Sequence, residues 1–314
     1  MNLAFVSVKT FRALLTVWLV LTFVFVVLRL SGDPALQLLP DDVDPETVEA
    51  YRRDWGLDRP IWEQYLRYFE AAFEGNFGLS FADRRPALEV IAERVPATLL
   101  LGLLSFAFAI VIGIPLGVLA ALKRDTFIDR FAMAFAVLGY AMPYFFMGIL
   151  LILLFSLQLR WLPSSGSETW WHLVMPVVTL GTTPAAMTAR FTRSSVLEVL
   201  NKPFIRTARA KGALPWREIV MHALPNAAIP VVTILGLRFG ELISGAVVTE
   251  TVFAWPGMGR LLVGAVANRD LAVVQGIVVL IALSMVTVNL LIDLAYGWLD
   301  PRIRTARAEG TAGP

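Results

Sequence analysis

Long stretches that are almost wholly apolar recur along this chain, and they restrict its possible folds more than any other feature. They cover residues 11–30, 97–122, 130–157, 173–192, 226–253 and 274–299. A helix rises ~1.5 Å per residue, so about 20 residues cross the ~30 Å hydrocarbon core of a bilayer. With 57% hydrophobic residues and a mean hydropathy of +0.68, the chain is too apolar for a soluble domain. The sequence therefore predicts an all-α polytopic membrane protein with six transmembrane helices.

Two of these runs need an argument of their own. A cleaved signal peptide is the alternative for residues 11–30, but the run is long for one and no Ala-x-Ala site follows it, so a retained helix is favoured. The run 173–192 is the weakest prediction because it is short and contains Pro184. Prolines also recur inside the other predicted helices, where neighbouring helices must satisfy the freed carbonyls; they are Pro115, Pro143, Pro176 and Pro230.

Basic residues gather on one side of the predicted membrane, and the positive-inside rule places that side in the cytoplasm. It holds both termini and includes Lys9, Arg12, Lys123, Arg124, Arg130, the Lys and Arg residues between 190 and 217, and Arg302, Arg304 and Arg307. The predicted order is a cytoplasmic N-terminus with the first helix (1–30), an extracytoplasmic loop (31–96), a five-helix core (97–299) that includes a cytoplasmic loop (193–225), and a cytoplasmic tail (300–314).

The cytoplasmic loop has the pattern of a compact helical hairpin. Residues 202–211 have helical spacing, and Gly212 can close that helix because glycine adopts the left-handed conformation. Pro215 suits the first turn of a second helix with its body at 216–224. Pro225 cannot donate a backbone hydrogen bond and restarts the chain into the next apolar run. We expect a stiff, water-facing hairpin that receives a push from a soluble partner and passes it to a membrane helix.

This loop resembles the EAA loop of permease subunits of ATP-driven (ABC) importers, whose pattern is Glu-Ala-Ala, three residues, Gly, nine residues, Ile, any residue, Leu-Pro. The positions that fit are Ala208, Gly212, Leu224 and Pro225, and those that depart are Arg206, Thr207 and His222. The resemblance implies that these positions together contact an ATPase subunit.

Segments elsewhere are similar to the first permease subunit of the dipeptide, oligopeptide and nickel importers. They are SGDP at 31–34, GLDRP at 56–60, QYL at 64–66, ETVF at 250–253, WPG at 255–257 with Gly259, Asn289, Asp293 and DPRIR at 300–304. The likeness covers the chain from about Ser31 to Arg304. It implies a subunit in the bacterial inner membrane that forms half of a path for di- or oligopeptides.

The same resemblance implies a set of partners. These are a second homologous permease subunit, two ATPase subunits that bind ATP and Mg, and an extracytoplasmic substrate-binding protein. The residues expected to meet the binding protein are Trp255, Pro256, Gly257 and Gly259, and the outer helical loop is a second candidate. No cofactor is expected in this chain itself.

Charges inside an apolar span are costly and need a partner or a function. Arg238 and Glu241 lie three residues apart, so they can pair on one face of the predicted fifth helix. They either line a peptide path or form an ion pair that fixes the helix register. The alternative function, a stand-alone secondary transporter, would use Glu241 and Asp293 for an ion gradient, but no inverted repeat is visible.

Motifs for other kinds of chemistry are missing from the sequence. It has no cysteine, which excludes disulfides and thiolate metal sites, and no GxxxxGK[ST] loop for ATP. His172 and His222 fall on opposite sides of the predicted membrane, so no shared metal site is expected. No nucleophile stands at a readable spacing from a base, and a net charge of +2 gives no reason to expect nucleic-acid binding. We therefore predict no catalytic residues.

Two further patterns concern packing. The outer loop has apolar residues at helical spacing between 45 and 75, which predicts an amphipathic helix on the membrane face, against a partner, or as a cap on the bundle. Gly113 and Gly117, and likewise Gly236 and Gly240, are spaced for close approach of two helix backbones.

Overall fold

The computed structural model describes residues 3–30, 44–54, 58–80, 82–239 and 241–299. Within those residues every regular element is a helix, and the one extended pairing is an isolated β-bridge between Leu79 and Pro86. This confirms the all-α prediction. The chain divides into two compact units, residues 1–96 with 257–314 and residues 97–256. The motifs predicted at 31–34 and 300–304 lie outside the described residues, as does part of the motif at 56–60.

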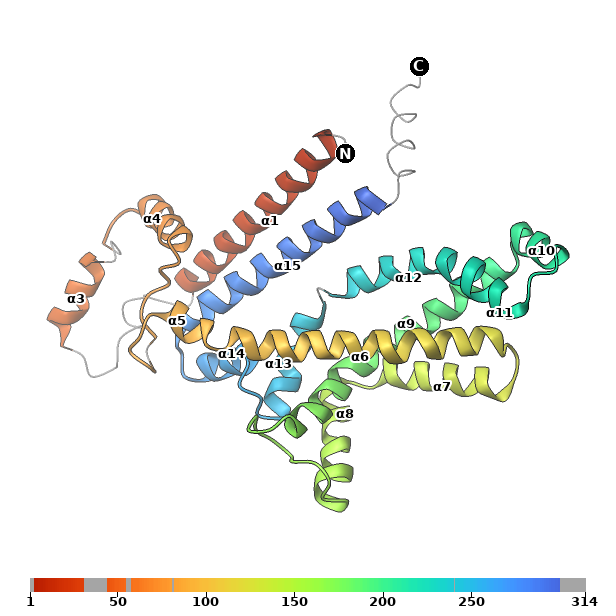
Figure 1. Ribbon diagram of the computed structural model, residues 1–314. Helices are drawn as coiled ribbons and strands as arrows, with labels where there is room; N and C mark the ends of the chain where they lie inside the picture. The colour runs from red at the N-terminus through yellow and green to blue at the C-terminus, as the bar shows by residue number, and fades with distance from the viewer. Residues whose placement is uncertain (1–2, 31–43, 55–57, 81, 240, 300–314) are drawn as a thin grey trace. The chain divides into compact units, whose positions relative to one another are not determined.

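The first unit is organised around two long helices that lie side by side (Figure 1). They are α1 (Leu3–Leu30) and α15 (Leu271–Leu299). Four shorter helices join them: α3 (Pro45–Asp54), α4 (Ile61–Phe73), α5 (Ala87–Ala92) and α14 (Met258–Ala267). The core of this unit forms where Ile91 of α5 meets Val273 and Ile277 of α15, all of which are buried.

The start of α15 is fixed by the buried carboxylate of Asp270. One oxygen accepts the backbone N–H of Val273 at 3.3 Å, as an N-terminal cap does. The other oxygen accepts the hydroxyl of Ser80 at 2.5 Å and the backbone N–H of Ala82 at 3.3 Å. Asp270 therefore ties the loop before α5 to the first turn of α15.

The second unit is built around the long helix α9 (Trp171–Leu200). Its other elements are α6 (Val95–Leu122), α7 (Phe127–Ala141), α8 (Tyr144–Leu151), the π-helix η1 (Ile152–Gln158), α10 (Pro203–Ala210), α11 (Pro215–Arg217), the π-helix η2 (Glu218–Ala223), α12 (Leu224–Phe239) and α13 (Glu241–Val252). α9 contacts α7, α8, α12 and α13, and buried residues occur along most of its length. The run that the sequence marks as weakest thus belongs to the helix with the most neighbours in this unit.

The predicted close approach at Gly113 and Gly117 is confirmed. A Cβ atom on Gly113 would lie 2.7 Å from the carbonyl oxygen of Ala185, and one on Gly117 would overlap the carbonyl oxygen of Ala189. α6 and α9 therefore meet backbone to backbone at this place, as small residues allow inside lipid. Gly240 lies outside the described residues, so the second pair stays a prediction.

The predicted count of six spans is not confirmed among the described residues. Three described helices are long and apolar enough to cross a membrane: Ser7–Val27, Ala87–Leu122 and Leu271–Ile292. Two bent pairs raise the number to five, and α9 is not among them. The run 130–157 is two helices that meet at 109°, because Pro143 follows a residue, Met142, that takes the extended conformation. The run 226–253 corresponds to α12 and α13, and Gly240 between them lies outside the described residues.

Candidate functional site

The hairpin predicted in the loop 193–225 is present, and its turn is a Schellman motif at Gly212. Gly212 has a φ of +81°. Its N–H donates to the carbonyl of Arg209 at 3.0 Å, and the N–H of Ala213 donates to the carbonyl of Ala208 at 3.1 Å. This pair of bonds satisfies the last carbonyls of α10, which glycine permits at no steric cost. No atom lies within 4 Å of a Cβ built on Gly212, so the position is restricted by its backbone angle and has room for a side chain.

The second arm of the hairpin differs from the prediction at Pro225. α11, η2 and α12 follow one another without a gap, so the chain stays helical through Pro225. The wider π turn at 218–223 comes directly before the proline. Pro225 has no N–H to donate, and its ring would press on the carbonyl four residues earlier. We attribute the wide turn to this conflict; as a result the hairpin passes directly into the long helix α12 (Figure 1).

One side chain anchors the hairpin to the helices behind it. Ile205 of α10 is completely buried in a cluster with Val196 and Val199 of α9, with Ala223 of η2 and with Ala227 of α12. The two arms and the end of α9 therefore share one small core. Because α10 begins at Pro203, three residues after α9 ends at Leu200, displacement of α10 is expected to move α9 as well.

A bidentate ion pair closes the hairpin from the side. Arg209 donates to both carboxylate oxygens of Glu218, through Nε at 3.1 Å and Nη2 at 2.6 Å. Glu218 is nearly buried, whereas the Arg209 side chain is largely exposed. The hydrogen bond to Glu218 and its negative charge raise the pKa of Arg209 above its ordinary value. The pair holds the end of α10 against the start of η2.

The outer surface of the hairpin is both apolar and basic. Its exposed apolar side chains are Phe204, Leu214, Trp216, Val220 and Met221, and its exposed basic residues are Arg206, Arg209, Lys211 and Arg217. The guanidinium of Arg217 lies 5.2 Å from the centre of the Trp216 ring. A surface of this kind suits a protein partner that offers apolar and acidic groups.

The residues predicted to contact an ATPase fall into two groups. Arg206, Thr207, Gly212, His222 and Pro225 are exposed. The other two, Ala208 and Leu224, are half-buried, and Leu224 packs against the cluster around Ile205. The structure thus brings the predicted segment together as one folded object, and its contact with an ATPase stays a prediction.

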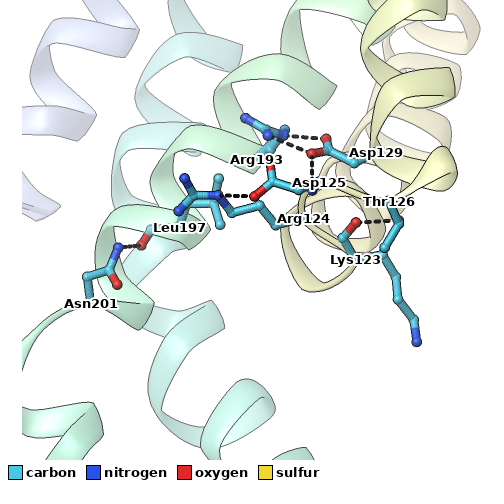
Figure 2. A network of polar contacts seen from close by, with 8 residues as sticks. All are labelled: Lys123, Arg124, Asp125, Thr126, Asp129, Arg193, Leu197 and Asn201. Carbon is cyan, nitrogen blue, oxygen red and sulfur yellow. Dashed lines mark hydrogen bonds and ion pairs between the residues drawn. The ribbon is translucent and has the colours of Figure 1, made fainter.

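A second charged contact lies on α9 close to the hairpin. Arg193 donates to both oxygens of Asp129, the first-turn acid of α7, at 2.6 and 2.7 Å (Figure 2). The backbone N–H of Asp125 donates to the same carboxylate at 2.9 Å. The Asp129 side chain is 5% exposed and that of Arg193 is 25% exposed. The pair joins the turn between α6 and α7 to the end of α9, and we call it the α7–α9 clamp.

Sequence reasoning missed both ion pairs. The sequence pattern places Arg193 and Arg209 in a loop rich in basic residues, which is typical of cytoplasmic segments and indicates no particular partner for either. One signal was available: Asp129 is an acid at the start of an apolar run and among basic neighbours, and such a charge needs a partner. Which arginine it meets depends on the fold.

The remaining predicted positions give a mixed result. Arg238 lies one residue before the end of α12 and Glu241 begins α13. Gly240 between them, the side chains of both residues and that of Asp293 lie outside the described residues, so their pairing stays a prediction. Trp255 is buried and its indole N–H donates to the carbonyl of Ala97 at 3.0 Å. The indole is thus a packing group in this structure.

The turn around Trp255 is tied down by a second contact. Thr98 donates to the buried carboxylate of Glu250 at 2.7 Å, which fastens the end of α13 to the first turn of α6. Gly257 and Gly259 are buried and Pro256 is half-buried. Little of this segment is exposed, and its contact with a binding protein stays a prediction.

Comparison with known proteins identifies the chain's relatives. Residues 113–305 match the family described as binding-protein-dependent transport system inner membrane component, and residues 2–102 match its N-terminal region. The chain is 44% identical to the glutathione transport system permease protein GsiC of Escherichia coli K12 over 285 residues, 91% of this chain and 93% of that protein. The protein of the same name from Shigella flexneri serotype 5b is 43% identical over the same length.

A solved structure agrees in fold. It is titled as the crystal structure of an amino acid ABC transporter with histidines, and it superimposes with a TM-score of 0.52 at 17% identity, covering 66% of this chain and 92% of that one. The family match covers most of the chain. This protein therefore belongs to the binding-protein-dependent transport system inner membrane component family, and it is a multi-pass permease subunit of an ATP-driven (ABC) importer.

Proposed function

We propose that this permease forms half of a translocation path and that its hairpin at 203–224 passes the motion of a separate ATPase subunit to the membrane helices. The observation that supports this most directly is the construction of the hairpin. Its outer face is apolar and basic. On its inner face Ile205 packs against α9, and the ion pair between Arg209 and Glu218 joins its two arms. Such an object moves as one body when it is pushed.

The proposed mechanism follows from that stiffness. Closure of the ATPase pair on ATP displaces the hairpin. α12 moves with it because it continues directly from η2, and α9 moves with it because Ile205 of α10 packs on its last turns. The permease then exchanges outward and inward openings, which is a two-state change biased by nucleotide. One hairpin serves one ATPase, so the assembly contains two ATPase subunits and a second permease. Both chain termini and the hairpin then lie in the cytoplasm of a bacterium.

For the substrate we propose a short peptide delivered by an extracytoplasmic binding protein. Relatives that share more than 40% of their residues with this chain are named for glutathione, which is itself a modified tripeptide. Uptake of a labelled dipeptide, a tripeptide, glutathione and a nickel chelate by the reconstituted importer would separate the possibilities. Transport of the nickel chelate alone would contradict the peptide proposal.

Gly212 offers the sharpest test of the hairpin. The φ of +81° is strained for a β-branched residue but tolerated by asparagine, and there is space for either side chain. We expect Gly212→Val to lower ATP-driven uptake in proteoliposomes while insertion into the membrane is unchanged, and Gly212→Asn to retain it. Full uptake by Gly212→Val would show that the turn is not needed.

The rival function makes a different prediction. A secondary transporter would carry substrate when this chain alone is placed in liposomes with a proton or sodium gradient. We expect no such uptake, and we expect the solubilised chain to co-purify with an ATPase subunit that is lost on Gly212→Pro. Gradient-driven uptake without any ATPase would overturn the proposed function.

A further inference from the structure

Helix α4 has one face packed on α1. The hydroxyls of Tyr65 and Thr22 lie 2.7 Å apart and share a hydrogen bond. The ring of Phe25 contacts Tyr65 edge to face at 5.3 Å between centroids and Tyr68 at 5.6 Å. This face of α4 therefore packs on a helix of its own unit.

A second face of α4 is apolar and exposed. Trp62, Leu66 and Phe73 are 65%, 59% and 81% exposed. Their spacing of four and seven residues puts them in one stripe along the helix. Glu63, Arg67 and Glu70 fall on the remaining side. A contiguous exposed apolar surface of this kind usually marks a site that contacts a membrane or another protein.

The contact with α1 places α4 beside the last turns of an apolar span. Thr22 and Phe25 lie within the apolar span Ser7–Val27, and Thr22 is five residues before Val27, or roughly 8 Å at 1.5 Å per residue. Interfacial helices lie about 5–10 Å into the boundary between headgroups and acyl chains. On α1 at the same level, Leu19 and Phe23 are 52% and 68% exposed, which is the surface that a spanning helix shows to lipid.

We infer that the stripe Trp62–Leu66–Phe73 inserts into the phospholipid leaflet at the C-terminal end of α1, so that α4 is a membrane anchor. Its occupant is the acyl region of the lipid, with the aromatic rings at the level where Trp and Tyr are enriched. The helix is then held from two sides, by α1 through Tyr65 and by lipid through Trp62.

The charges around α4 indicate whether its insertion requires anionic lipid. Arg59 forms an ion pair with Glu63, and Nε of Arg67 lies 3.7 Å from the same carboxylate. Glu70 adds a further negative charge. No basic cluster faces the headgroups among the described residues of α4, so insertion rests on apolar area and is independent of anionic lipid.

The test uses the absence of cysteine from the chain, which makes an introduced cysteine unique within this chain, so the chain is labelled before it is assembled with its partners. Trp62→Cys and Leu66→Cys carry a nitroxide, and Arg67→Cys and Glu70→Cys are matched controls on the polar side. The full-length chain, in complex with its importer partners, is placed in nanodiscs of phosphatidylcholine with and without phosphatidylglycerol. Collision rates of each label with oxygen and with a water-soluble nickel chelate are measured by electron paramagnetic resonance.

We expect labels at 62 and 66 to favour oxygen over the nickel chelate, labels at 67 and 70 to show the reverse, and both results to be equal in the two lipid compositions. Equal, water-like exposure at all four positions would overturn the anchor. So would protection of 62 and 66 from both reagents, which would indicate a protein occupant. A lipid signal that appears only with phosphatidylglycerol would overturn the apolar mode of insertion. None of these readouts depends on transport, so they stand apart from the proposed function.

Discussion

The α7–α9 clamp predicts an unequal response to the loss of its two partners. Arg193→Met leaves the Asp129 carboxylate, which is 5% exposed, with the backbone N–H of Asp125 as its remaining donor in the clamp. Asp129→Asn instead removes the buried charge. Arg193 is 25% exposed and can then turn toward water. The arginine variant should therefore be the more damaging of the two.

The magnitudes follow from this difference in burial. Breaking a buried pair so that one charge stays unpaired costs about 3–5 kcal/mol. Loss of the charged hydrogen bonds alone costs about 1.5–3 kcal/mol, and less here because Arg193 can be solvated. The double variant Asp129→Asn with Arg193→Met should resemble Asp129→Asn, so the two changes are not additive. At about 2–4 °C per kcal/mol for a unit of 150–250 residues, Arg193→Met should lower Tm by on the order of 10 °C.

The assay is thermal unfolding in detergent, followed by the fluorescence of the nine tryptophans. Glu198→Gln provides a control on the same helix, because its ion pair with Lys202 is exposed on both sides and should leave Tm unchanged. Equal Tm values for Arg193→Met and Asp129→Asn would refute the burial argument. The double variant has no unpaired charge at position 129, so it should be more stable than Arg193→Met. A double variant that is less stable than Arg193→Met would also refute the burial argument.

Three further changes test the packing described above. Ile205→Ala empties a fully buried site, so we expect a loss of about 2–4 kcal/mol and a lower ratio of uptake to ATP hydrolysis; an unchanged ratio would mean the anchor is not needed. Gly117→Leu forces a side chain into the carbonyl of Ala189 and should lower Tm far more than Gly102→Leu, where a Cβ meets no atom within 4 Å. Asp270→Ala removes the cap of α15 and the partner of Ser80, and protease should then cut the segment around Ser80 faster than in the parent.

The fold class and the hairpin could be predicted because their signals are local. Apolar length reports a membrane helix directly, and Gly212 followed by Pro215 marks a turn that needs only neighbouring residues to form. The long-range features could not be predicted. Asp129 and Arg193 are 64 positions apart, and nothing in either segment selects the other among many arginines.

α9 shows why the hydropathy of a segment can mislead. Its threonines lower the apolar score, yet Thr182 and Thr188 donate to the carbonyls of Val178 and Pro184 at 2.6 and 2.7 Å. Hydropathy measures the cost of meeting lipid, whereas α9 is surrounded by α7, α8, α12 and α13. A helix that meets protein on most sides needs no lipid-like surface. The threonines that lower the hydropathy of α9 therefore agree with its position among other helices.

The position of the clamp on α9 has a consequence for how motion would spread. Arg193 lies seven residues before the end of α9 at Leu200, so it is about two turns from the hairpin at 3.6 residues per turn. A displacement of α10 that reaches α9 through Ile205 must also pull on Asp129, at the first turn of α7. The other end of α7 is the 109° corner with α8. Because a buried pair resists separation, we expect the corner to move with the hairpin in the intact protein and to lag behind it in Arg193→Met, as a distance between nitroxides at the turn and at the corner would show.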